Sequence, residues 1–257
     1  MFTNLKNTKI IFILCLIFIV PSKIYFSVLN SNFERTPLFA IVLILLGSLL
    51  YYSIYSNKNI SNELKLRKNF FLSTISAVLC ALFFICSFNY FTDKKIYSFE
   101  LQPLIMFFLN ILVSVSFAII SASYFSGKSK FNGANSFFVF IPSIMYIINI
   151  IFFVLVTSGK PNQYDVALKC LISMVFLYST QFFVNSTKKN IKKMLLIFGM
   201  LTILVSLMHN IPNLISYKSL SRLDLILNLT ELTVCLYTAF IILEIRKNLF
   251  KNHTTII

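Results

Sequence analysis

The sequence has 257 residues, of which 58% are hydrophobic and 12% are charged, about half the charged fraction of a typical soluble domain. The formal net charge of +15 would suit a nucleic-acid ligand, but the basic residues lie in short segments between apolar runs, where they act as orientation signals in membrane proteins. The composition therefore excludes an ordinary soluble domain, and we expect a protein of the lipid bilayer that binds no nucleic acid.

Apolar runs of about 20 residues, the length that crosses a bilayer, follow one another along the chain. They are continuous, whereas the strands of a transmembrane barrel alternate apolar and polar residues. The sequence therefore predicts an all-α, polytopic transmembrane helix bundle that forms one integral membrane domain over residues 1–257. Eight spans are expected, at about 10–30, 37–56, 70–91, 103–125, 136–157, 166–186, 193–215 and 225–245.

The first span begins in the stretch "MFTNLKNTKIIFILCLIFIVPSK". A cleaved signal peptide is one interpretation of its short apolar core. No small-x-small cleavage site follows, however, and the apolar run continues past Lys23, so we favour an uncleaved helix bent at Pro21. Two later helices have clear starting signals. Thr36 is a suitable N-cap before Pro37, and Pro103 likewise suits a first turn.

Lys and Arg are unevenly distributed over the segments between the predicted spans. With the N-terminus in the cytoplasm, fifteen of the 23 basic residues fall on the inner side and eight on the outer side. Positive charge favours the cytoplasmic face, so we expect both termini inside, which agrees with an even number of spans. The abundance of Ile, Lys, Asn and Phe is typical of an AT-rich bacterial genome. We therefore expect a multi-pass protein of a bacterial cytoplasmic cell membrane.

A weak internal repeat relates two of the predicted spans. Residues 164–189 and 223–248 align without gaps, which places Asp165 opposite Asp224 and matches a Leu-Tyr pair in each segment. A duplication would make the sixth and eighth helices copies of one unit. The alternative is shared composition, because membrane helices use few residue types and tyrosine favours the membrane interface.

Motifs that would indicate a catalytic or cofactor site are missing from the sequence. It has no glycine-rich phosphate loop, no CxxC and no GxSxG elbow, and its two histidines, His209 and His253, are far apart. The cysteines all lie in apolar segments, where a thiol behaves as a small hydrophobe. We therefore expect no metal, no cofactor, no disulfide and no enzyme activity. The cysteines are Cys15, Cys80, Cys86, Cys170 and Cys235.

Glu231 stands about two turns inside the predicted span 225–245, roughly 9 Å below its outer end at about 1.5 Å per residue. An ionisable side chain in a membrane is costly and is a functional candidate by default. Several amides, a histidine and a lysine fall at a similar depth when the other spans are measured in the same way. We predict that they bind a ligand together in the outer half of the bundle. The candidate set is Glu231, Asn228, His209, Asn210, Asn149, Asn110 and Lys169.

Polar residues also recur at helical spacing along single faces of four spans, which should turn toward protein or water and away from lipid. For the Ser and Thr positions we favour helix-to-helix adhesion over a ligand role. Pro212 cannot donate a backbone hydrogen bond and so frees a carbonyl near His209, and we expect Pro142 to bend the fifth helix. The stripes are Thr202, Ser206, His209 and Asn213; Asn228, Glu231 and Cys235; Asn110, Ser114 and Ser121; and Ser73, Ser76, Cys80 and Ser87.

Three functions compete. The favoured one is a transporter or membrane sensor that binds a small molecule or cation in an outward-facing polar cavity around Glu231; pairing of Glu231 with Lys169 would remove the preference for a cation. The alternative is a non-catalytic accessory subunit of a kinase, an ATP-driven exporter or an envelope assembly, contacting its partner through the basic loops 57–69 and 187–193. An intramembrane enzyme, the third, would require direct contact between Glu231 and His209.

Overall fold

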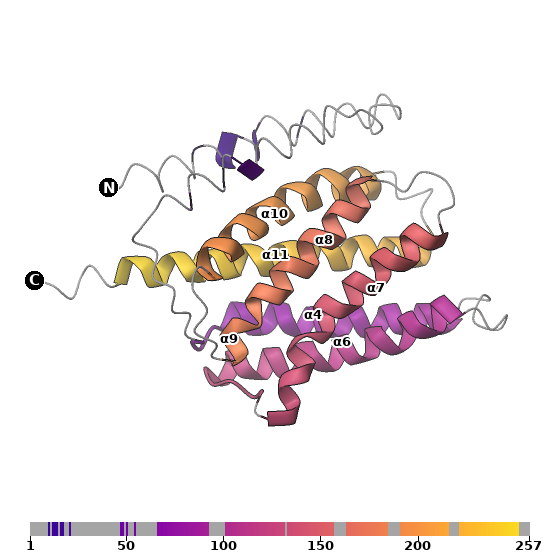
Figure 1. Cartoon of the computed structure of the whole chain (residues 1–257), viewed down its shortest axis with the longest axis horizontal. Coiled ribbons are helices and arrows are strands. Elements are labelled where there is room, and N and C mark those ends of the chain that lie inside the picture. Colours follow the sequence, from indigo (N-terminus) through magenta and orange to yellow (C-terminus); the bar gives the residue numbers. More distant parts are fainter. Residues whose placement is uncertain are drawn as a thin grey trace, which may run out of the picture.

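The computed structural model describes residues 66–92, 101–131, 133–156, 163–184, 191–215 and 221–251, together with scattered positions between 10 and 54. Throughout those six segments the regular structure is helical (Figure 1), which confirms the all-α prediction. The elements are α4 (Phe70–Thr92), α6 (Leu101–Ser126), the 3-10 helix η3 (Gly133–Val139), α7 (Ile141–Val156), α8 (Gln163–Ser179), α9 (Gln181–Val184), α10 (Ile191–Ile215) and α11 (Arg222–Lys251).

Four of these helices are long and apolar enough to cross a membrane, and they fit a membrane-embedded protein. Their candidate spans are Phe70–Tyr90 in α4, Leu101–Ser126 in α6, Ile191–Ile215 in α10 and Arg222–Ile245 in α11. Each coincides closely with a predicted span. The first two predicted spans fall largely outside the described residues, so the total of eight spans and the cytoplasmic placement of both termini stay predictions.

The fifth and sixth predicted spans are each divided into two helices. The segment predicted at 136–157 forms η3 and then α7, whose shorter apolar part is Ile141–Phe152. The amide of Ile144 donates to the carbonyl of Phe140, so Pro142 lies in the first turn of α7. A proline there loses no helical hydrogen bond. The predicted bend of the fifth helix at Pro142 is instead a break between η3 and α7, and Pro142 lies where α7 begins.

The break between α8 and α9 lies at Thr180. Its hydroxyl donates to the carbonyl of Leu177 at 2.6 Å, and the hydroxyl of Ser179 donates to the carbonyl of Phe176 at 3.0 Å. Hydroxyls that bond back to the preceding turn compete with the helical ladder. Two such residues in succession accordingly accompany the change of direction that ends α8 inside the predicted span 166–186.

Six helices close into a ring. Consecutive helices pack against each other in the order α4, α6, α7, α8, α10 and α11, and α11 returns to pack against α4. Aromatic side chains fill the middle of the ring. The ring of Phe117 lies 5.5 Å from Phe83, 5.6 Å from Phe176 and 5.9 Å from Tyr237, measured between centroids. These four side chains come from four different helices, so contacts among them hold α4, α6, α8 and α11 together in the interior of the bundle.

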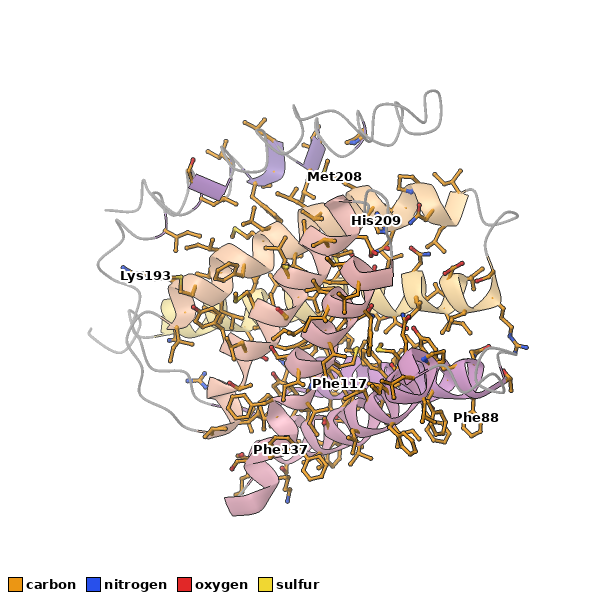
Figure 2. The ribbon with its side chains drawn as sticks, turned by 45° about the vertical axis from the view of Figure 1, so that its right-hand side comes forward. Phe88, Phe117, Phe137, Lys193, Met208 and His209 are labelled. Atoms are coloured by element: carbon orange, nitrogen blue, oxygen red, sulfur yellow. The ribbon has the colours of Figure 1, made fainter. Side chains whose placement is uncertain are left out.

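Reciprocal serine contacts join α4 to α6. The hydroxyl of Ser73 donates to the carbonyl of Ser121 at 3.0 Å, and the hydroxyl of Ser121 donates to the carbonyl of Ser73 at 2.8 Å. Farther along, the hydroxyl of Ser114 donates to the carbonyl of Cys80 at 2.9 Å. These bonds confirm that the polar stripes of the two helices face protein and hold the helices together. The opposite faces expose apolar side chains such as Phe88 (Figure 2), as suits contact with lipid.

Candidate functional site

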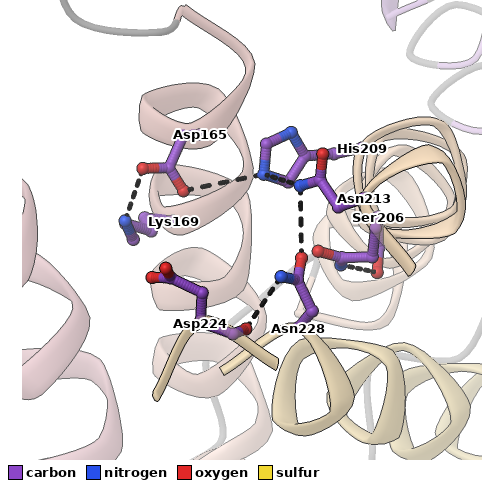
Figure 3. Close-up of polar contacts among 8 residues, drawn as sticks. Asp165, Lys169, Ser206, His209, Asn213, Asp224 and Asn228 are labelled. Carbon is purple, nitrogen blue, oxygen red and sulfur yellow. Dashed lines mark hydrogen bonds and ion pairs between the residues drawn. The ribbon is translucent and has the colours of Figure 1, made fainter. Parts of the chain in front are cut away.

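Polar side chains from α8, α10 and α11 meet at the end of the ring where α8 and α11 begin and α10 finishes (Figure 3). On α8, Nζ of Lys169 contacts Oδ2 of Asp165 at 2.6 Å, with the two side chains 11% and 15% exposed. The spacing of four residues places them on one helix face. Asp165 also lies in the first turn of α8, where a negative charge is favourable.

His209 and Asn213 of α10 extend this ion pair toward α11. Nε2 of His209 lies 4.0 Å from Oδ1 of Asp165 and 3.3 Å from Nδ2 of Asn213. The same amide nitrogen of Asn213 donates to Oδ1 of Asn228 at 3.3 Å. A continuous line of contacts therefore runs from Lys169 on α8, through α10, to Asn228 on α11.

Asn228 is anchored by the start of its own helix. Its Nδ2 donates to the carbonyl of Asp224 at 2.8 Å. Asp224 and Ser221 cap α11: the amide of Asp224 donates to the hydroxyl of Ser221 at 3.1 Å, and that hydroxyl donates to Oδ2 of Asp224 at 2.6 Å. In the weak repeat Asp224 aligns with Asp165, but the two carboxylates differ in role, since one caps its helix and the other joins two helices.

Glu231 lies about one turn beyond Asn228 on α11 and is 8% exposed. Its carboxylate faces the side chain of Asn210, and Lys169 and Asp165 are within electrostatic range. The side chain of Ser206 on α10 bonds to the backbone of α11. Its hydroxyl donates to the carbonyl of Glu231 at 3.4 Å and accepts from Nδ2 of Asn210 at 3.1 Å. The sequence left open whether Lys169 pairs with Glu231; the 2.6 Å contact of Lys169 is with Asp165.

When Glu231 is ionised, the charges of this group do not balance. Asp165 and Glu231 are two carboxylates, and Lys169 is one ammonium, so the three together carry one negative charge when His209 is neutral. Because Asp165 and Lys169 already neutralise each other, the excess charge is on Glu231. A buried negative charge of this kind favours a positively charged partner.

Five of the seven predicted site residues meet here, whereas Asn110 and Asn149 make no hydrogen bond to the cluster among the described residues. Asn110 is buried on α6, and its Nδ2 donates to the carbonyl of Met106 at 2.6 Å in its own helix. Asn149 is half-buried on α7. No hydrogen bond between described residues joins either side chain to the cluster. Both lie at a suitable depth, but depth along a helix does not say which neighbour that helix faces.

Two residues of the cluster were missing from the predicted set. The sequence drew attention to Asp165 only through the weak repeat, where it aligns with Asp224, and Asn213 was placed on the stripe of its helix without a ligand role. Sequence spacing could have identified both residues, because Asp165 is four residues before Lys169 and Asn213 is four residues after His209. Such pairs share a helix face.

The two basic loops predicted to contact a protein partner are only partly described. At the end of loop 57–69, Nδ2 of Asn69 donates to Oε2 of Glu244 at 3.0 Å, and Nζ of Lys68 lies 5.3 Å from the ring centroid of Phe125. The described part of loop 187–193 belongs to α10, where Lys192 and Lys193 are 4% and 8% exposed. These two buried lysines are poorly placed to contact a soluble partner, and Lys188 and Lys189 lie outside the described residues.

No protein-family model matches the chain, and neither a curated protein nor a solved structure matches it.

Proposed function

We propose that this chain is a multi-pass membrane protein, a transporter or a membrane sensor, that binds a cation or a cationic small molecule at the cluster around Glu231. One observation carries the proposal: the carboxyl group of Glu231 is buried beside Asp165 and Lys169, whose opposite charges cancel each other and so leave no counter-charge for Glu231. An unbalanced carboxylate inside a membrane is costly. A bound cation offsets that cost, and the neighbouring amides provide oxygen atoms to orient it.

The helix geometry around the cluster supports the same function. Pro212 lies inside α10, one residue before Asn213, and cannot donate to the carbonyl of Met208 four residues earlier. Although α10 continues as one helix to Ile215, backbone carbonyls without a helical donor commonly line substrate and ion sites in transporters. We propose a binding role for His209 and Glu231 and no catalytic one, with the protein in the cell membrane and both termini in the cytoplasm.

The proposal is tested by thermal unfolding of the purified chain in lipid nanodiscs. Sodium, potassium, ammonium and a series of primary and quaternary amines would be added singly to the wild type, to Glu231→Gln and to Glu244→Gln. Glu244 is the matched control, because it belongs to the same helix and accepts its hydrogen bond from Asn69, away from the cluster. We expect at least one cation to stabilise the wild type and Glu244→Gln but not Glu231→Gln. Equal stabilisation of all three by every active cation would overturn the proposal.

The accessory-subunit function is tested through the same basic loops that suggested it. Charge reversal at Lys188 and Lys189 should abolish co-purification of a partner if that function holds. The burial of Lys192 and Lys193 favours the ligand-binding function, because these two lysines lack the exposure that a docking surface requires.

A further inference from the structure

The Asn210 side chain leaves one hydrogen-bonding atom unsatisfied. Asn210 is fully buried, and its Nδ2 donates to the hydroxyl of Ser206 at 3.1 Å. Its Oδ1 is buried without a hydrogen-bond partner, alone in this respect among the buried side-chain polar atoms of the described residues. A buried acceptor without a donor costs free energy, so this oxygen marks a place where a proton donor or a cation is expected.

The neighbours of Asn210 identify the donor. The hydroxyl hydrogen of Ser206 is directed to the carbonyl of Glu231 at 3.4 Å. The carboxyl group of Glu231 faces the Asn210 amide, and a carboxyl group becomes a hydrogen-bond donor when it carries a proton. We propose that Glu231 carries an exchangeable proton, which it donates to Oδ1 of Asn210, and that the cluster therefore exchanges this proton for its cationic ligand. The exchange rests on the proposed function; the proton on Glu231 does not.

Burial of Glu231 favours a neutral carboxyl group, whereas Lys169 and the amide of Asn210 favour the carboxylate. From α8 come Asp165 and Lys169, which form an ion pair with each other and so act on Glu231 as a dipole, not as a full charge. From α4 and α7 come Cys86 and Tyr146, whose thiol and phenol carry no charge in their protonated forms. From α10 comes Asn210, with His209 beside it in sequence. With a proton on Glu231, the charges of Asp165, Lys169 and Glu231 sum to zero.

Loss of the proton has a definite structural consequence. The O–H bond of the Glu231 carboxyl group breaks, the proton passes to water, and the electron pair stays on the carboxylate. A half-turn of the Asn210 amide then places Nδ2 toward the carboxylate and Oδ1 toward Ser206, whose hydroxyl changes its acceptor from the carbonyl of Glu231 to this oxygen. A monovalent cation that replaces the proton restores the same net charge, so one proton leaves for each positive charge bound.

Infrared spectroscopy of the full chain in lipid nanodiscs tests the proton directly, since a protonated carboxylic acid has a carbonyl stretch that a carboxylate lacks. We expect a carboxylic-acid band at neutral pH without added ligand, shifted to lower frequency in D2O, and absent from Glu231→Gln. Asn210→Leu removes the acceptor, so the band should move to higher frequency. Asn110→Leu is the matched control: it changes an equally buried amide that bonds within α6, and it should leave the band in place.

Two results would overturn the inference: no acid band that depends on Glu231 at neutral pH, or a band that Asn210→Leu and Asn110→Leu move equally. Asn210→Ala makes the same comparison if the leucine variant does not fold. Loss of the acid band when sodium is added would support the exchange. A Glu231 carboxylate signal that is present before sodium is added, and that sodium shifts, would overturn the inference, because no proton is then present to leave. The infrared acid band tests the proton on Glu231, and thermal unfolding tests cation binding, so each hypothesis can fail without the other. A proton without any stabilising cation removes the proposed function, and a stabilising cation without an acid band removes this inference.

Discussion

Nε2 of His209 lies 4.0 Å from Oδ1 of Asp165, across the interface between α8 and α10. The carboxylate thereby has a histidine on one side and, at 2.6 Å, the ammonium of Lys169 on the other. Asp165 is thus the residue through which the start of α8 is connected to the end of α10. This connection holds the wall of the proposed binding site in place.

Replacing Asp165 by Asn should destabilise the protein strongly. The substitution removes the carboxylate that contacts the ammonium of Lys169 at 2.6 Å, and the side chain of Lys169 is only 11% exposed. Removing one partner of a buried ion pair costs roughly 3–5 kcal/mol, and we expect about 3 kcal/mol here because the pair is partly exposed. Reversible unfolding in mixed detergent micelles would measure the free energy of unfolding.

The control for Asp165→Asn is Asp224→Asn, the aligned acid of the weak repeat. It weakens only the cap formed with Ser221, which is worth about 1 kcal/mol. The double variant Asp165→Asn/Lys169→Met removes both charges and should recover most of the loss. Equal losses for Asp165→Asn and Asp224→Asn would show that Asp165 acts only at the end of its own helix.

Gly199 should resist replacement by Ala although Ala is the better helix former. A Cβ atom at Gly199 would lie 2.9 Å from Cδ1 of Ile242 and 3.0 Å from Cγ2 of Thr238, both on α11. Overpacking costs about 1–3 kcal/mol, whereas the gain in helix propensity is about 1 kcal/mol. We expect a net loss of about 1 kcal/mol in the free energy of unfolding for Gly199→Ala.

A second substitution identifies the contact that Gly199 protects. Ile242→Val deletes the Cδ1 atom, so Gly199→Ala should cost less in that background than in the wild type. Gly47→Ala is the matched control, because its Cβ atom would meet only Cδ1 of Leu201, at 3.7 Å. A loss for Gly199→Ala that Ile242→Val leaves unchanged would contradict the close approach of α10 and α11.

Gly127 should be sensitive for a different reason. Its φ angle is +70°, and an added Cβ atom would lie 2.9 Å from the backbone nitrogen of Lys68. The left-handed conformation alone costs about 1–2 kcal/mol for a residue with a Cβ atom, so Gly127→Ala should lower the free energy of unfolding by at least this amount. Gly127→Asn relieves the dihedral cost but keeps the Cβ atom. Full recovery of stability in Gly127→Asn would show that Lys68 does not crowd this position.

The serine contacts between α4 and α6 should contribute modestly. Ser121→Ala removes the bond to the carbonyl of Ser73, and bonds between membrane helices are worth about 0.6 kcal/mol on average. The same unfolding measurement checks this value. Thr74→Ala is the control, since the hydroxyl of Thr74 is exposed and bonds to Phe70 of its own helix. A larger loss for Thr74→Ala would contradict the adhesive role of the stripe.

The sequence predicts where the helices lie along the chain, but it does not predict which helices pack against each other. Continuous apolar runs identified α4, α6, α10 and α11 to within a few residues, because length and hydropathy alone decide whether a helix can cross a bilayer. The interruptions at Phe140 and Thr180 depend on local hydrogen bonds that hydropathy does not register. A run of apolar residues therefore locates a span but does not show that the span is one helix.

The candidate site was predicted in part for the same reason. Glu231, Asn228, His209, Asn210 and Lys169 lie together because α8, α10 and α11 are neighbours in the ring. Asn110 satisfies the same rule of depth, but α6 occupies the opposite part of the ring, next to α4 and α7. Depth follows from counting residues, whereas the order of helices around a ring depends on packing that a single sequence does not display.

Ring closure also has a consequence for how the protein is made. Five of the six interfaces join helices that are consecutive among the ring helices. The sixth joins α11 to α4, the last ring helix to the first, so the ring can close only once α11 has been synthesised. Glu231 and Asn228 arrive with that helix. Until then α8 and α10 carry Asp165, Lys169 and His209 without their partners from α11, and the interior is open on one side. The proposed binding site is therefore complete only when the ring closes.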